Sequence, residues 1–329
     1  MKHYIIIVLL AFLCQSCTDK GKIHSGDEAD SDSLVSPTMR QQTTKVGIAF
    51  GGGGAKGAAE IGVLKTIEKS GLRIDYVAGS SMGAVIGGLY AAGYTAHELD
   101  SLMTTEEWLS LFDRNELGVT MAGNDRTVFG LIKGDVFEEY LRETLQKKGC
   151  KNIGDTKKVN QVTFACTATN IISKDDIVEV VLKGDDVDMA KAIRASMTYP
   201  APLVGYKPVS IDGMLLVDGG MLNNLPVDVV KEMGAEKVIA IDLERGNKKE
   251  RKLALGELMN LGWLVNWLLD HPDRNKHNRN FEMADIKIRP DLLGYTILSF
   301  NEIDFHDMML LGEDDAKTYH WEELMELKK

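Results

Sequence analysis

The chain has 329 residues, of which 44% are hydrophobic and 26% charged, so it can bury a large core without a disulfide scaffold. Its formal net charge of -11 argues against nucleic acid as the main partner, because phosphate binding relies on clustered lysine and arginine side chains. The same charge disfavours purely electrostatic adhesion to anionic lipid.

The amino-terminal segment has the features of an export signal. Lys2 and His3 precede an apolar run over residues 4–13. This run is shorter than the roughly 20 residues of a membrane-spanning helix, but it matches the apolar part of a secretory signal. We therefore expect a signal peptide over residues 1–17, with an ordinary signal or an uncleaved anchor as alternatives to a lipoprotein signal.

A cysteine at the end of this segment is a candidate lipidation site. Ser16 and Cys17 resemble a loose bacterial lipobox, in which the cysteine is diacylated, although Cys14 stands where that motif prefers leucine. Residues 18–44 are polar, with almost no apolar periodicity, and predict a flexible tether. The expected product is exported and anchored to a membrane, periplasmic or at the cell surface. Its folded domain is expected over residues 45–329, with a helical carboxyl-terminal extension.

A strand, a glycine-rich turn and a helix open the folded part. Residues 46–50 are apolar and predict a buried strand, and a glycine run over residues 51–57 follows at once. An amphipathic helix is predicted over residues 58–70, with Gly71 as its carboxyl-terminal cap. Such a turn presents backbone N–H groups beside the positive end of the helix dipole, so we expect it to bind an anion.

The glycine run also satisfies the G-x-G-x-x-G pattern over residues 52–57, which makes a dinucleotide-binding oxidoreductase an alternative. A dinucleotide fold needs an acidic residue at the carboxyl end of its second strand. Asp75 instead precedes the expected strand over residues 76–78. A Walker loop is also disfavoured, because Gly57 and not serine or threonine follows Lys56.

A G-x-S-x-G motif over residues 79–83 occupies the end of that second strand. A helix of small residues is predicted over residues 84–93, which gives the strand, turn and helix of a nucleophile elbow. Gly79 and Gly83 leave room for a serine with strained backbone angles on so sharp a turn. Ser81 is therefore the candidate nucleophile, and a simple glycine-rich turn is the alternative.

A candidate base follows in a predicted hairpin over residues 209–220. The pair Asp212-Gly213 predicts a tight turn between its strands. Asp218 ends the second strand, and Gly219 and Gly220 behind it would let the nucleophile and substrate approach its carboxylate closely. An Asx turn that only stabilises the loop is the alternative role for this aspartate.

Metal and disulfide chemistry are not expected. The spacing of Cys150 and Cys166 does not match a zinc site, and a disulfide between them is the less favoured alternative to two buried thiols. His306 stands near two aspartates, but no further ligand spacing accompanies it. We expect neither a metal nor a cofactor.

In this order, the glycine loop, the G-x-S-x-G motif and the Asp-Gly-Gly segment resemble the patatin-like phospholipases. The resemblance is seen over residues 48–93, 192–197, 217–227 and 288–292, which are distributed along nearly the whole chain after the tether. The alternation of strands with helices predicts a parallel sheet covered on both faces. The expected fold is therefore α/β, a three-layer α/β/α sandwich with a mostly parallel central sheet.

The resemblance implies a role for each motif. Ser81 would be the nucleophile and Asp218 the other half of a catalytic dyad, while the amides of Gly52, Gly53 and Gly54 would form the oxyanion hole. The family does not require a catalytic histidine. The remaining motif glycines are Gly57, Gly79, Gly83, Gly219 and Gly220.

These assignments predict a serine-dependent acyl hydrolase that acts on phospholipid, lysophospholipid or another ester through an acyl-enzyme. A non-catalytic lipid-binding protein is the alternative, but it explains poorly why both dyad residues are intact. A Ser-acid-His triad could recruit His271, His277, His306 or His320, yet none of them lies in a recognisable strand-end loop. An apolar helix over residues 258–269 is expected to pack in the core, with a lid or membrane contact as the alternative.

Overall fold

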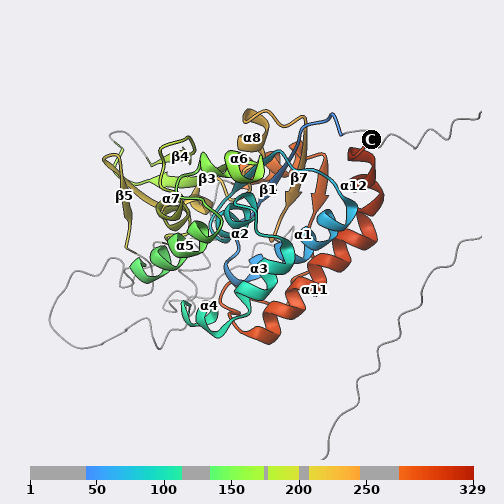
Figure 1. The fold of residues 1–329 in the computed structure, drawn as a ribbon, viewed down its shortest axis with the longest axis horizontal. Helices are drawn as coiled ribbons and strands as arrows, with labels where there is room; N and C mark the ends of the chain where they lie inside the picture. The colour runs from blue at the N-terminus through green and yellow to red at the C-terminus, as the bar shows by residue number, and fades with distance from the viewer. Residues whose placement is uncertain (1–41, 113–133, 174–176, 200–206, 245–273) are drawn as a thin grey trace, which may run out of the picture. The chain divides into compact units, whose positions relative to one another are not determined.

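The computed structural model describes residues 42–112, 134–173, 177–199, 207–244 and 274–329. In these residues eight strands form one sheet between two layers of helices (Figure 1). The sheet has the order β5-β6-β3-β2-β1-β7-β8, and β4 pairs with β3. The predicted three-layer α/β/α sandwich is confirmed. The predicted signal peptide with Cys17, nearly all of the tether, His271 and the helix over residues 258–269 lie outside the described residues.

Five neighbouring strands run parallel and extend to one edge of the sheet. They are β1 (Val46–Phe50), β2 (Tyr76–Gly79), β3 (Thr163–Asn170), β7 (Lys237–Ile241) and β8 (Ile286–Ile288). The antiparallel strands are β4 (Val178–Leu182), β5 (Val209–Ile211) and β6 (Met214–Asp218). Phe50 pairs with Gly79 on one side and Ile241 on the other, so three carboxyl ends meet at one edge of the sheet.

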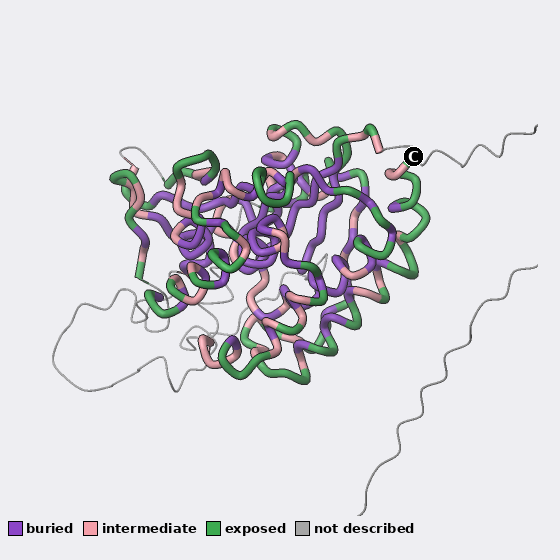
Figure 2. The backbone as a smooth tube through the Cα atoms, in the orientation of Figure 1, coloured by how far each residue is buried: buried purple, intermediate pink, exposed green. Residues whose placement is uncertain are grey.

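Side chains of the central strands alternate between two apolar layers. Figure 2 marks the residues of these strands as mostly buried. Ile48 and Phe50 share the larger layer, and Ala49 points into the smaller one. The helices of the larger layer include α1 (Ala58–Ser70), α2 (Met82–Ala91), α7 (Met189–Ser196) and α11 (Glu302–Tyr319). The smaller layer is covered by α8 (Val227–Glu232) and α10 (Arg274–Met283).

Two helices between the Ser81 turn and Asp218 pack into the core. Trp108 and Phe137 are buried, and their ring centroids lie 5.8 Å apart. Their helices are α4 (Glu106–Ser110) and α5 (Asp135–Lys147). The other described helices are η1 (Gly54–Gly57), α3 (Ala96–Met103), α6 (Asp155–Asn160), η2 (Gly219–Met221) and α12 (Trp321–Leu327).

Local chain signals match the structure at several positions. Gly71 caps α1 in the left-handed conformation, with φ 69°. Asp212 and Gly213 both have positive φ, 49° and 77°, as a two-residue hairpin turn of type I′ requires. Cys150 and Cys166 are both buried free thiols, and burial raises the pKa of Cys150 to about 11.

The five described ranges of the chain contain neither a membrane-spanning helix nor a cluster of metal ligands. Within those ranges, no helix combines the length and apolarity needed to cross a bilayer. They also contain no cluster of three or more histidine, cysteine, aspartate or glutamate residues that could hold a metal ion.

Helices α1 and α11 approach each other closely through two glycines. A Cβ atom placed on Gly62 would lie 1.9 Å from the carbonyl oxygen of Met309, and one on Gly312 would lie 2.0 Å from that of Ala59. Both obstacles are backbone atoms, which cannot rotate away. The close packing of these helices therefore depends on the absence of side chains at the two positions.

We expect Gly312→Ala to lower the free energy of unfolding by about 2 kcal/mol, because the added methyl overpacks the contact between α1 and α11. Helix propensity alone would predict a gain of about 1 kcal/mol for this change, so the sign is decisive. Urea unfolding followed by circular dichroism measures it. Gly294→Ala is the control: no atom lies within 4 Å of its Cβ position, and only the strain of φ +99° opposes the change.

Candidate active site

Ser81 lies on the sharp turn between β2 and α2, where the sequence motif predicts it. Its backbone has φ 53° and ψ -125°, a strained conformation for a residue with a side chain. A Cβ atom on Gly79 would lie 2.2 Å from the Gly83 carbonyl oxygen, and one on Gly83 would lie 2.6 Å from that of Gly51. The motif glycines are thus required by backbone contacts on both sides of the turn.

Asp218 ends β6, and its carboxylate reaches the serine. Ser81 Oγ donates a hydrogen bond of 2.7 Å to Asp218 Oδ2, and the Gly220 amide donates one of 2.7 Å to Oδ1. The aspartate is 3% exposed. Burial raises the pKa of Asp218 to about 6, even though the bonds from Ser81 and Gly220 lower it. This carboxylate is therefore more basic than that of an exposed aspartate.

The two glycines after Asp218 are required by contacts that the sequence did not indicate. A Cβ atom on Gly219 would lie 2.3 Å from the carbonyl oxygen of Thr167, and one on Gly220 would lie 2.6 Å from Asn224 Oδ1. The chain can therefore turn tightly enough to bring the Gly220 amide back to the carboxylate. Asp212, the other aspartate of the hairpin, lies exposed in its turn, as the sequence predicts.

The glycine loop lies beside Ser81. A Cβ atom on Gly52 would be 3.0 Å from Ser81 Cβ, and one on Gly57 would be 2.5 Å from Met82 Cγ. The Gly52 amide donates a bond of 3.0 Å to the carbonyl of Asn224. By contrast, the amides of Gly53 and Gly54 make no hydrogen bond with the described part of the chain.

Asn224 connects this loop with the Asp-Gly-Gly turn, and sequence analysis did not assign it a role in the site. Its carbonyl accepts from the Gly52 amide, and its Nδ2 donates back to the Gly52 carbonyl at 3.2 Å. Nδ2 also donates to Glu244 Oε1 at 3.1 Å. One buried asparagine therefore fixes the first part of the glycine loop against the segment that follows Asp218.

Three other contacts with Ser81 and Asp218 were not predicted from the sequence. Ser196 Oγ accepts from the backbone amide of Ser81 at 3.0 Å. The Thr198 carbonyl accepts from the Asp218 amide at 2.8 Å, and Thr169 Oγ1 donates to the Asp218 carbonyl at 2.9 Å. The family resemblance of residues 192–197 was the one sequence signal near these contacts.

The three described histidines that could belong to a triad are not paired with the serine. Each of them either bonds to another residue or lies at the surface. His277 is buried, and its Nε2 lies 3.2 Å from Asp242 Oδ2, an oxygen that also binds Arg289. His320 Nδ1 lies 2.6 Å from Glu323 Oε2, and His306 is exposed. None of these three has a hydrogen bond to Ser81 or Asp218. The serine is therefore paired with a carboxylate directly.

Asp75 lies at the amino ends of the strands, away from the edge that carries Ser81. It precedes β2, and its carboxylate accepts from Lys45 Nζ at 2.8 Å and from the Val46 amide at 3.1 Å. These bonds lower the pKa of Asp75 against the effect of its burial. Its position matches the sequence prediction, and it gives no support to dinucleotide binding.

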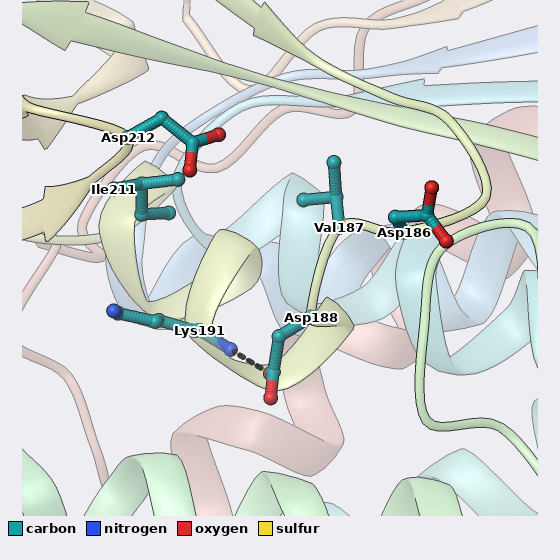
Figure 3. A pocket seen from close by; sticks show the side chains of 6 residues that line it. All are labelled: Asp186, Val187, Asp188, Lys191, Ile211 and Asp212. Atoms are coloured by element: carbon teal, nitrogen blue, oxygen red, sulfur yellow. Dashed lines mark hydrogen bonds between the residues drawn. The ribbon is translucent and has the colours of Figure 1, made fainter.

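A separate pocket lies at the amino-terminal end of α7 (Figure 3). The carboxyl-terminal end of this helix, at Ser196, contacts Ser81. Asp188 caps the amino-terminal end by accepting from the Lys191 amide at 2.9 Å. The pocket is also bounded by the hairpin turn, at the far end of β6 from Asp218. It is lined by Asp186, Val187, Asp188, Lys191, Ile211 and Asp212.

Comparison with known proteins gives a family match and several relatives. The family model for "Patatin-like phospholipase" matches residues 48–231. The human "Patatin-like phospholipase domain-containing protein 6" is 32% identical over 268 residues, 79% of this chain and 18% of that protein. YqhO of Bacillus subtilis is 31% identical over 211 residues, 62% of this chain and 72% of that protein.

A fungal relative also aligns with most of the chain. "Lysophospholipase NTE1" of Candida glabrata is 28% identical over 264 residues, 79% of this chain and 14% of that protein. The chain therefore spans less than a fifth of the human and fungal relatives, and most of the bacterial one.

Proposed function

The chain belongs to the patatin-like phospholipase family, and we propose that it is a serine-dependent lipid acyl hydrolase. The observation that carries the proposal is the 2.7 Å hydrogen bond from Ser81 Oγ to the buried carboxylate of Asp218. The names of the relatives support a phospholipid or lysophospholipid ester as the substrate. The reaction would be that of a phospholipase A, a lysophospholipase or a related esterase.

In the first half of the reaction, Ser81 Oγ attacks the ester carbonyl carbon while its proton passes to Asp218 Oδ2. The carbonyl oxygen takes the negative charge of the tetrahedral intermediate. When the intermediate collapses, the bond to the alcohol oxygen breaks and that oxygen takes the proton from Asp218. The products are the released alcohol and an acyl group attached to Ser81.

In the second half, water attacks the acyl-Ser81 carbonyl and Asp218 accepts a proton from that water. Collapse of the second tetrahedral intermediate breaks the bond to Ser81 Oγ, which recovers its proton from Asp218. The fatty acid leaves, and the 2.7 Å hydrogen bond between the two residues is restored. A single carboxylate thus serves as base and acid in turn.

We propose that Gly53 and Gly54 supply the oxyanion hole. Their amides make no hydrogen bond with the described residues, whereas the Gly52 amide already donates to Asn224. Gly54 has φ 56°, and a Cβ atom there would lie 2.4 Å from the Ile297 carbonyl oxygen. One well-placed donor in such a hole contributes about 3–4 kcal/mol to stabilisation of the transition state.

Hydrolysis of defined lipids tests this proposal. The full chain would be incubated with phosphatidylcholine, lysophosphatidylcholine, triacylglycerol and p-nitrophenyl butyrate, and the released acid or nitrophenol measured. We expect release of fatty acid from at least one phospholipid class, with none from the Ser81→Ala variant. Hydrolysis of the nitrophenyl ester alone would restrict the function to a general esterase, and a wild-type chain inactive on all four would contradict it.

A further inference from the structure

Ser81 and Asp218 lie at the ends of two strands that meet along one side of β3. β2 pairs with Thr163–Cys166 and β6 with Ala168–Asn170, while β4 occupies the other side of β3 over Cys166–Asn170. β2 and β6 therefore follow one another along β3 and form no ladder with each other. The sheet brings the serine and the aspartate close together, and contacts outside the sheet hold their backbones in place.

The carboxyl-terminal end of α7 contacts both residues. Ser196 Oγ accepts from the Ser81 amide at 3.0 Å, and two residues later the Thr198 carbonyl accepts from the Asp218 amide at 2.8 Å. Ser196 and Thr198 are each 0% exposed. The segment Ser196–Thr198, here called the bridging turn, thus holds the backbones of both members of the pair.

The bridging turn is itself held in the core. Thr198 Oγ1 donates to the Arg194 carbonyl at 2.7 Å, and the Met197 amide donates to the Ile193 carbonyl at 3.1 Å. Ile193 is fully buried, and α7 packs against α2, β3 and β6. The acceptor that Ser196 offers to Ser81 is consequently part of a fixed framework.

We infer that Ser196 is a positioning residue for Ser81, an inference that rests on the proposed function. Ser81 has strained backbone angles, and such a conformation persists only where its surroundings hold it. The Ser196 hydroxyl oxygen gives the Ser81 amide its acceptor and so keeps Oγ directed at Asp218. Without that acceptor, the turn can relax and the nucleophile spends less time in the reactive geometry.

The test compares Ser196→Ala and Ser196→Thr with wild type, using p-nitrophenyl butyrate hydrolysis and the rate of fluorophosphonate labelling. We expect Ser196→Ala to lower kcat and the labelling rate by about 10- to 100-fold with KM within about threefold, because the Ser196 side chain is buried and its hydroxyl oxygen accepts from the Ser81 amide. Ser196→Thr keeps the hydroxyl and should recover much of the activity.

Ser70→Ala is the matched control. Ser70 is also a buried serine whose Oγ accepts a backbone amide, that of Leu72 at 3.2 Å, but it ends α1 away from the site. It should lower the urea midpoint about as much as Ser196→Ala and leave kcat unchanged. If Ser196→Ala does not fold, Ser196→Cys replaces it, since sulfur keeps the volume and is a weaker acceptor.

The measurements on wild type and on the variants distinguish the positioning role of Ser196 from the proposed hydrolase function. An active wild type with Ser196→Ala kcat within threefold of it, or an equal kcat loss in Ser70→Ala, overturns the positioning role and leaves the hydrolase proposal intact. A wild type that neither hydrolyses the ester nor reacts with the probe overturns both.

Discussion

Ser81→Ala and Asp218→Asn are each expected to lower kcat/KM for ester hydrolysis by about a thousandfold or more. The first change removes the attacking oxygen. The second leaves an amide that cannot accept the proton from Ser81 Oγ, although the two side chains lie within hydrogen-bond distance. Loss of a nucleophile or of its partner in other serine hydrolases has effects of this size or larger. Initial rates with p-nitrophenyl butyrate and with the preferred lipid measure the change.

The neighbouring serine supplies a matched control for the nucleophile. Ser80 is fully buried, and its hydroxyl has no hydrogen-bond partner among the residues described. Ser80→Ala should therefore keep activity within about threefold and be at least as stable as wild type, because it removes an unsatisfied polar group. A fluorophosphonate probe should label wild type and Ser80→Ala but not Ser81→Ala. Labelling of Ser81→Ala at the wild-type rate would remove Ser81 from the mechanism.

The strands and helices near the site could be predicted because their signals are local. The apolar run of β1 and the periodicity of α1 gave the bounds Val46–Phe50 and Ala58–Ser70 that the structure has. Gly71 and the Asp212-Gly213 pair marked turns because positive φ restricts which residues fit there. Ser81 was identified in the same way, since the elbow is made by five consecutive residues.

Contacts between distant segments could not be predicted in this way. Ser196 is 115 residues from Ser81, and Asn224 is 172 residues from Gly52. No local pattern predicts either role, because each depends on hydrogen bonds that exist only after the sheet has formed. The hydrogen bond from the Gly52 amide to the Asn224 carbonyl is another contact between distant segments. Because of it, the proposed oxyanion donors are Gly53 and Gly54 and no longer include Gly52.

The pH dependence of kcat/KM should follow the ionisation of Asp218. The base must be a carboxylate to accept the serine proton, and burial raises its pKa to about 6. We therefore expect kcat/KM to be constant well above pH 6 and to fall by about tenfold per pH unit well below it. Initial rates between pH 4.5 and 8.5, at constant ionic strength, would show this. A midpoint near 4, the ordinary value for aspartate, would contradict the raised pKa.

The same raised pKa predicts that the Asp218 carboxylate destabilises the fold at neutral pH. Between its ordinary pKa of 3.8 and about 6, the folded protein holds a proton that the unfolded chain has released. The contribution of this group to stability is thus fully present below pH 3.8 and is lost as the pH rises through about 6. About two pH units at 1.4 kcal/mol each give an upper limit of about 3 kcal/mol.

Asp218→Asn should accordingly be more stable than wild type at pH 8, by up to about 3 kcal/mol, while it loses activity. Urea unfolding of both proteins between pH 4 and 8 measures the difference, which should shrink as the pH falls through 6. Asp212→Asn, in the exposed hairpin turn at the other end of β6, should leave stability nearly unchanged at every pH. Equal stability of Asp218→Asn and wild type at pH 8 would show that burial of the carboxylate costs the fold nothing. If Asp218→Asn is the more stable protein at pH 8, the rest of the core offsets the cost of burying the Asp218 charge.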